Sequence, residues 1–322
     1  MILYGAYVYS LDPPVFSMAD SFVPRMLAIL PEDVRQRATF LVFPTWTKEP
    51  WRRIASTLWR MRSWPKIRLI WMGSTRREVR RLRSLGFEAR WCHQNLFCNE
   101  DDLQLLPSTD RPFDAVYNAV LMPYKRHHLL AGVSKLRLIT GSLDRLAELP
   151  KLGLTHATVN DRFLTKSEVA QVLSQCKCGL ALSAEEGGML ASTEYLLCGL
   201  PVVSTPSIGG RDVYYSDTNH IACEPSIDSV AEAVTAAVAR DWDRAAIRRA
   251  AIDRSKHFRQ ALSDCVREIA GTSPFDANTI TGTWFIQNFL AIHFMAEFFA
   301  GVSGGAFRRD DLLGRFQTEA AA

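Results

Sequence analysis

The chain has 322 residues, of which 48% are hydrophobic and 22% are charged, and its formal net charge at pH 7 is +4. This composition, with a mean hydropathy of −0.04, excludes a disordered or fibrous protein and is typical of a globular one. Because single hydrophobic cores stop growing near about 250 to 300 residues, we expect two domains.

The first third of the chain alternates short apolar runs with helical patterns. Residues 39–44 and 66–73 are predicted strands, and their unbroken apolar character is typical of parallel strands covered on both faces. The spacing of apolar residues predicts an amphipathic helix over 51–60 and a second helix over 75–85, which ends at Gly86. Because strands and helices alternate, the sheet should be parallel.

The segment 51–90 is strongly basic. It contains twelve lysines and arginines against two glutamates, a net charge of +10. One interpretation is a set of solvated helix faces. The other is a surface that attracts an anionic bilayer or an acidic or phosphorylated acceptor. No RNA-binding or DNA-binding motif accompanies these residues, so we expect no nucleic-acid partner.

The alternating pattern restarts after a connector at 107–112. Strands are predicted at 114–120, 136–140, 157–160, 178–183 and 201–206, and helices at 124–133, 166–174, 190–198 and 227–240. The second lobe is therefore also α/β, and ligands of such sheets bind at the carboxyl ends of the strands. We place an N-terminal domain at 1–111, a second domain at 112–275 and a C-terminal helical segment at 276–322.

The remaining segments bear on location. The apolar stretch 283–302 is interrupted by polar residues and is not expected to cross a membrane. A helix over 283–299 is expected to pack back on the first domain, with a peripheral membrane contact as the alternative. The N-terminus lacks the pattern of a signal peptide. Seven irregularly spaced cysteines favour buried, reduced thiols and a cytosolic location.

The stretch 178–210 carries the most informative chemistry. A predicted strand ends at Ser183, and a glycine-containing loop leads to the next predicted helix. Backbone N–H groups at the start of that helix could approach a diphosphate, helped by the positive end of the helix dipole. These N–H groups belong to Gly187, Gly188, Met189 and Leu190.

Two carboxylates flank this loop. Glu186 can accept hydrogen bonds from sugar hydroxyls, and Glu194, eight positions later, can accept them from ribose hydroxyls. One loop would then bind both ends of a nucleotide sugar. Glu185 is expected either to face solvent or to lie behind Glu186. Asp241 and Asp243 precede a helical pattern, and a helix cap explains them better than a metal site, so we expect no bound metal.

The combined pattern is an apolar strand, two glutamates separated by seven residues, Leu-x-Cys-Gly-x-Pro-Val-Val and a Gly-Gly pair. Its residues are Ser183, Glu186, Gly187, Glu194, Leu197, Cys198, Gly199, Pro201, Val202, Val203, Gly209 and Gly210. This pattern resembles the donor domain of retaining GT-B glycosyltransferases of group 1, of the family 4 type. The resemblance implies an α/β fold of two Rossmann-like, doubly wound domains that face a cleft.

The same resemblance implies an activity and its partners. It implies retaining transfer of a sugar from a UDP- or GDP-linked donor, without a metal ion or other cofactor, in bacterial glycan or glycoconjugate synthesis. The acceptor would be a hydroxyl of a glycan, a lipid-linked molecule or a small molecule. Two alternatives keep the fold: a nucleotide-sugar-binding scaffold without catalysis, and an epimerase or hydrolase of sugar nucleotides.

The resemblance also assigns roles to individual residues outside the loop. Lys125 matches the family's lysine that neutralises the donor diphosphate, and Arg126 is expected to assist it. Asn118 stands where the family usually has a basic residue, and this departure motivates the scaffold alternative. In the first domain, His93 is the candidate for the family's cleft histidine that contacts the sugar.

Overall fold

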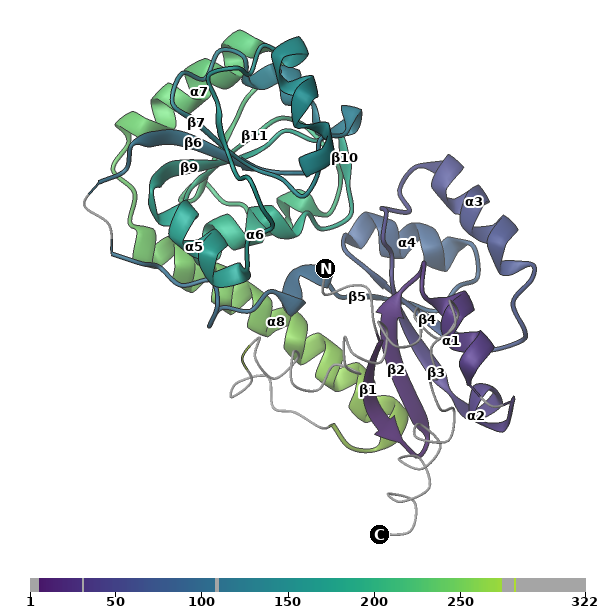
Figure 1. The fold of residues 1–322 in the computed structure, drawn as a ribbon. Coiled ribbons are helices and arrows are strands. Elements are labelled where there is room, and N and C mark those ends of the chain that lie inside the picture. Colours follow the sequence, from purple (N-terminus) through teal and green to yellow (C-terminus); the bar gives the residue numbers. More distant parts are fainter. Residues whose placement is uncertain (1–5, 31, 108–109, 274–280, 282–322) are drawn as a thin grey trace. The chain divides into compact units, whose positions relative to one another are not determined.

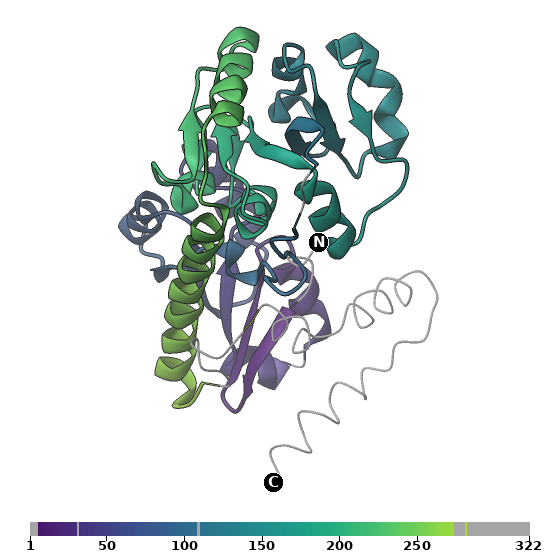
Figure 2. The same cartoon turned by 90° about the vertical axis from the view of Figure 1, so that its left-hand side faces the viewer.

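The structure is a computed structural model that describes residues 6–30, 32–107, 110–273 and 281. The chain forms two compact units (Figure 1), which Figure 2 shows in a view turned by 90°. One contains the chain up to Phe97 and again from Lys256, and the other is Cys98–Ser255. The first unit thus ends before the boundary predicted at residue 111. The helix predicted over 283–299 lies outside the described residues, as does all of the predicted segment 276–322 except residue 281.

The first unit is built on a five-stranded sheet with the order β1-β2-β3-β4-β5. The strands are β1 (Ala6–Leu11), β2 (Pro14–Ala19), β3 (Thr39–Phe43), β4 (Arg68–Gly73) and β5 (Ala89–Trp91). β1 and β2 pair antiparallel, and the other neighbours are parallel. The helices are α1 (Val23–Ile29), α2 (Glu32–Arg37), α3 (Trp51–Met61) and α4 (Arg76–Ser84). Because parallel strands that follow chain order are joined by right-handed crossovers, these helices cover one face of the sheet.

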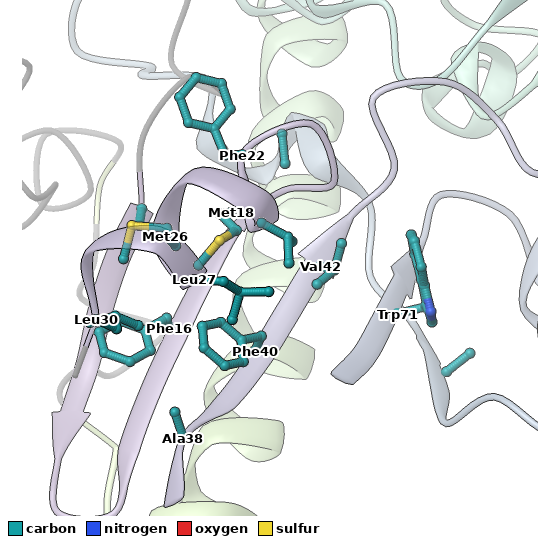
Figure 3. Close-up of a cluster of buried hydrophobic side chains, with 14 of the residues drawn as sticks. Phe16, Met18, Phe22, Met26, Leu27, Leu30, Ala38, Phe40, Val42 and Trp71 are labelled. Atoms are coloured by element: carbon teal, nitrogen blue, oxygen red, sulfur yellow. The ribbon is translucent and has the colours of Figure 1, made fainter. Parts of the chain in front are cut away.

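That face carries the hydrophobic core of the first unit (Figure 3). Phe16 of β2 and Phe40 of β3 stack there with ring centroids 5.6 Å apart. Met26 and Leu27 of α1 belong to the same buried cluster. Side chains alternate between the two faces of a strand, so each strand commits every second residue to this core.

The helix α8 (Arg244–Ala270) starts in the second unit and ends in the first. In the first unit the rings of Phe258 and Trp91 are nearly perpendicular, with centroids 5.1 Å apart. The backbone carbonyl oxygen of Phe258 accepts a hydrogen bond of 3.5 Å from the Cys92 thiol. These contacts anchor the second half of the helix next to β5. Within the described part of the chain, no helix combines the length and the apolar character needed to cross a membrane.

The second unit has a six-stranded parallel sheet with the order β13-β11-β9-β6-β7-β8. Its strands are β6 (Phe113–Asn118), β7 (Leu136–Ile139), β8 (Thr158–Val159), β9 (Cys176–Ala181), β11 (Val202–Ser204) and β13 (His220–Ala222). Its helices include α5 (Lys166–Ser174), α6 (Leu190–Leu197) and α7 (Ile227–Ala239). The chain runs outward from β6 to one edge and then from β9 to the other. This is the strand order of a doubly wound nucleotide-binding fold, so the predicted α/β, Rossmann-like class is confirmed, whereas the strand order of the first sheet shows no such reversal.

Two of the differences between the sequence analysis and the structure have a clear physical reason. The helix predicted over 124–133 is wrong, because this segment forms two 3₁₀ helices, Pro123–Lys125 and His127–Leu130. Arg126 between them is left-handed, with φ of 55°, and such a residue cannot continue a helix. The β1–β2 hairpin was not predicted, because the prolines at its turn argue against strands on either side. Proline is rare within strands.

Candidate functional site

The strand order of the second unit reverses between β6 and β9, and the loops after these two strands carry most of the predicted site residues. β6 ends at Asn118 and β9 ends at Ala181. In open parallel sheets, ligands bind outside the carboxyl ends of the strands at such a reversal, because the two loops there run to opposite sides of the sheet. The fold therefore brings the loops 119–126 and 182–189 to one ligand-binding edge.

Lys125 and Glu186 come from these two loops and form an ion pair between Nζ and Oε1. The hydroxyl of Tyr117 on β6 fixes the lysine, because it donates a hydrogen bond of 2.6 Å to the carbonyl oxygen of Lys125. Glu186 lies in β10 (Glu185–Glu186), which pairs with β12 (Ile208–Gly209). Each side chain is only 11% exposed, so the two charges attract each other with little screening by water.

Glu194 lies in α6, and its carboxylate is held by two donors. Asn118 Nδ2 donates to Oε2 at 3.1 Å, and the ammonium of Lys166, the first residue of α5, pairs with Oε1. Burial lowers the pKa of Lys166, but the Glu194 carboxylate outweighs burial and the net effect raises that pKa. A carboxylate has about four acceptor positions, so these two donors leave capacity for the hydroxyl groups of a ligand.

Tyr195 links this helix to the end of β6. Its hydroxyl accepts a hydrogen bond of 2.6 Å from the backbone N–H of Asn118. The ring is fully buried and lies against β9 at Gly179, where a Cβ atom would come within 2.2 Å of the ring. Glycine at this position therefore allows α6 to approach the sheet closely enough for Glu194 to reach Asn118.

The glycine turn joins β10 to α6. The carbonyl oxygen of Gly187 accepts a hydrogen bond of 2.7 Å from the N–H of Gly210, and Gly188 is buried beside it. Met189 adopts the left-handed conformation, with φ of 45°, and α6 begins at Leu190. The first N–H groups of an α-helix lack acceptors inside the helix and carry partial positive charge. The predicted phosphate-binding turn thus lies at a helix N-terminus, directly after Glu186.

Arg211, which the sequence analysis missed, joins the carboxyl ends of β9 and β11. Its fully buried guanidinium donates to the carbonyl oxygens of Ala181 at 2.8 Å, of Ser183 at 3.1 Å and of Thr205. Ser183 is also fully buried, and its hydroxyl lies 3.9 Å from the sulfur of Met189. In the structure Ser183 supports the turn, and its contact with a donor stays a prediction.

Arg126 and His127 directly follow Lys125 in the chain. Nη1 of Arg126 is buried and has no hydrogen-bond partner among the described residues. An unpaired buried donor costs about 1–3 kcal/mol, so this nitrogen is suited to an anionic ligand. Burial and the neighbouring Lys125 charge lower the pKa of His127 to about 4. His127 is therefore neutral near pH 7, and the positive charge of this segment rests on Lys125 and Arg126.

His93 belongs to the first unit, whereas the other predicted site residues belong to the second. Its side chain is fully buried, and Nδ1 accepts a hydrogen bond of 3.1 Å from the N–H of Asn95. The imidazole ring lies 5.6 Å from the ring of Phe258. These contacts place it before the 3₁₀ helix Gln94–Phe97, and its contact with a sugar stays a prediction.

Three smaller expectations can be compared with the structure. Glu185 is buried in β10, so the alternative that it faces solvent is wrong, and the alternative that it lies behind Glu186 stays a prediction. Asp243 accepts a hydrogen bond of 2.8 Å from the N–H of Ala246 at the start of α8, which confirms the helix cap. All seven cysteines carry free thiols. No group of three or more His, Cys, Asp or Glu residues in the described ranges could hold a metal ion.

Sequence reasoning missed Lys166 and Tyr195 for different reasons. Lys166 is 28 residues from Glu194, and nothing in its local pattern distinguishes it from a surface lysine. For Tyr195 a clue existed, because a glycine inside an apolar strand, here Gly179, often marks the close approach of another group. The pattern does not indicate which group that is.

Part of the second unit is similar to a known protein family. Residues 122–240 match the sequence family described as glycosyl transferases group 1. No curated protein sequence matches the chain. The family match contains Lys125, Glu186 and Glu194 and covers most of the second unit.

Several solved structures resemble the chain. HepE from Anabaena in complex with UDP has a TM-score of 0.52 at 16% identity, over 72% of this chain and 73% of that chain. A TarM mutant from S. aureus, in complex with fondaparinux, alpha-GlcNAc-glycerol and UDP, has a TM-score of 0.58 at 15% identity, over 78% of this chain and 55% of that chain. Sucrose-phosphate synthase from Thermosynechococcus elongatus has a TM-score of 0.50 at 15% identity, over 80% of this chain and 72% of that chain. The chain has the GT-B fold, and its residues 122–240 are similar to group 1 glycosyl transferases.

Proposed function

We propose that the protein transfers a sugar from a nucleoside diphosphate donor to an acceptor hydroxyl, with retention of configuration at the sugar carbon. The observation that carries this proposal is the presence of two Lys–Glu ion pairs around one phosphate-binding turn. In the pair Lys125–Glu186 the glutamate directly precedes the turn. In the pair Lys166–Glu194 the glutamate follows the turn, in α6. The family match over 122–240 and the UDP in the HepE structure support the same function.

The diphosphate would bind at the turn and at the neighbouring cations. The N–H groups at the start of α6 are suited to its oxygens, and Lys125 and Arg126 supply positive charge. The diphosphate would replace Glu186 as the partner of Lys125, and the Glu186 carboxylate would then accept hydrogen bonds from the sugar hydroxyls. Because two protein cations neutralise the leaving diphosphate, we propose that the transfer needs no metal ion.

Glu194 would bind the ribose. Its carboxylate is oriented by Lys166 and Asn118, and both donors leave acceptor capacity for the ribose hydroxyls. Asn118 therefore acts here through Glu194 and supplies no charge to the diphosphate. The stabilisation of the leaving group consequently depends on Lys125 and Arg126 alone.

Retention would follow from attack on the same face as departure. The bond between the sugar carbon and the diphosphate oxygen breaks as the bond to the acceptor oxygen forms, and the acceptor proton passes to the departing phosphate oxygen. No protein nucleophile takes part in this route. Most of the rate would come from orientation and from electrostatic stabilisation of the diphosphate.

Donor binding is the first test. Isothermal titration with UDP, GDP and their sugar conjugates should show binding of one nucleotide series. Lys125→Met should weaken that binding at least about tenfold, because it removes a buried charge next to the diphosphate. Glu186→Gln should affect the nucleotide sugar more than the free nucleotide. The matched control is Lys177→Met, whose ion pair with Asp114 of 2.7 Å lies at the opposite, amino end of β9.

Product analysis is the second test. The purified protein, with the donor that it binds, is incubated with glycan, lipid-linked and small-molecule acceptor fractions in the presence of EDTA. We expect a glycosylated product whose anomeric configuration, measured by NMR, equals that of the donor. An inverted product contradicts retention. Free or isomerised sugar without acceptor indicates a hydrolase or epimerase, and binding without any turnover indicates a nucleotide-sugar-binding scaffold.

A further inference from the structure

Helix α3 of the first unit has apolar side chains that remain exposed to solvent. Ile54 and Thr57 are its buried residues, and they define the side that packs on the core. Trp51 and Trp59 are 61% and 70% exposed, and Leu58 is also exposed. Single exposed apolar residues are normal on a protein surface, but two tryptophans on one short helix form a larger apolar patch.

The exposed apolar residues form one stripe along the helix. With about 100° of rotation per residue, Trp51, Ala55, Leu58 and Trp59 fall within a sector of roughly 100°. The two tryptophans are eight residues apart, which is about 12 Å along the axis. One flat surface can therefore contact both rings, with the helix lying parallel to that surface.

Positive charge surrounds the stripe. The segment 51–90, which includes α3 and α4, has a net charge of +10. The two helices cover the same face of the sheet (Figure 1). Arg62 and Lys66 after α3 and Arg80 and Arg83 on α4 are exposed, and none of these four forms an ion pair with any residue that the structure describes. Arg83 Nε donates a hydrogen bond of 2.8 Å to the carbonyl oxygen of Ala89, and no carboxylate of the described residues neutralises any of the four charges.

We propose that α3 docks the protein on a bilayer surface that carries anionic headgroups. Tryptophan favours the boundary between lipid and water, because its ring is apolar and its indole N–H is polar. A helix with an apolar stripe and cationic flanks lies in the plane of this boundary, with the apolar side among the acyl chains and the cations at the phosphates. Both halves of that description are present in α3 and its neighbours.

The charge distribution favours a bilayer over a second copy of this chain. Three arginines of the segment 51–90 pair with carboxylates outside it, which leaves a net charge of +7 (10 − 3), and two copies of such a segment would repel each other. The bilayer contact goes beyond the proposed sugar transfer and does not depend on it, because α3 belongs to the first unit and the donor residues belong to the second. It places the first unit at an interface where lipid-linked molecules are within reach.

Vesicle sedimentation of the full chain tests the proposal, without any donor present. The vesicles are phosphatidylcholine alone and an equal mixture of phosphatidylcholine and phosphatidylglycerol. We expect binding to the mixture, little binding to phosphatidylcholine, and weakening by salt. The double variant Trp51→Ala with Trp59→Ala should bind at least about tenfold more weakly, because each ring removes a large apolar area from water. Phe163→Ala, at a residue 71% exposed in the second unit, should bind like the wild type.

Charge is tested separately with matched double variants. Arg62→Gln with Lys66→Gln should weaken binding to the mixed vesicles about thirtyfold, because each cation near an anionic surface contributes about a fivefold effect. Lys135→Gln with Lys151→Gln removes the same charge from exposed positions of the second unit and should have a much smaller effect. Circular dichroism confirms that each variant is folded. Absence of binding to mixed vesicles, or equal binding by the tryptophan variant, would overturn the proposal, as would equal effects of the two charge variants.

Discussion

The close contact between Gly179 and Tyr195 allows a sharp test of how the fold positions the candidate site. In Gly179→Ala, the new Cβ atom would lie 2.2, 2.4 and 2.8 Å from three carbon atoms of the Tyr195 ring. The ring is fully buried and cannot move outward without breaking the hydrogen bond of 2.6 Å between its hydroxyl and the N–H of Asn118. Overpacking costs about 1–3 kcal/mol and the lost buried hydrogen bond about 1–2 kcal/mol. We expect a free energy of unfolding lower by about 3 kcal/mol.

A double-mutant cycle isolates the clash from other effects. Tyr195→Ala alone should cost about 3–5 kcal/mol, but Gly179→Ala added to it should cost almost nothing, because the methyl group then enters the vacated space. Tyr195→Phe keeps the ring and measures the hydrogen bond alone. Gly141→Ala is the control, since its Cβ would meet only the exposed ring of Phe163 at 3.3 Å.

Urea denaturation gives the four corners of the cycle, and isothermal titration with the bound nucleotide gives the effect on the site. Nucleotide affinity should fall in Gly179→Ala, because Tyr195 adjoins Glu194 and holds the backbone of Asn118. Strictly additive free energies in the cycle, or a Gly179→Ala protein as stable as the wild type, would refute the reasoning.

Two further predictions concern charged groups around the site. Lys166→Met should lower nucleotide affinity about tenfold and the free energy of unfolding by about 1–2 kcal/mol, because Glu194 loses its cationic partner. Lys166→Arg should retain most of the affinity and most of the stability. Titration calorimetry measures the affinity, and urea denaturation measures the stability. The pKa of His127 is lowered to about 4 in the folded protein, against 6.5 in the unfolded chain, so folding favours the neutral imidazole. The contribution of His127 to the free energy of unfolding is therefore lost as the pH falls from about 6.5 to 4. Between pH 7 and 4 the wild type should lose about 3 kcal/mol more than His127→Phe, and equal losses in urea denaturation at the two pH values would contradict this.

The sequence was sufficient for those features that depend on local periodicity. Unbroken apolar runs predicted β3, β4, β6 and β9, because strands covered on both faces of a parallel sheet have no polar side. The glycine turn and the start of α6 were predicted because glycine and the helical pattern are local properties. The segment after β6 was mispredicted, since the left-handed conformation of Arg126 interrupts the helix and has no trace in the residue type.

The composition of the candidate site was predictable in part. The pattern of Glu186 and Glu194 around the turn identified a donor-binding loop, and Lys125 was placed by the same resemblance. The sequence could not indicate that Lys125 pairs with Glu186, or that Asn118 and Lys166 share Glu194. Those contacts join residues that are far apart in the chain, and only the order of the parallel strands brings them together. The sequence by itself determined the residue types of the site. The tertiary structure decided which charges meet, because these charges lie on helices and loops that only the packing around the parallel sheet brings together.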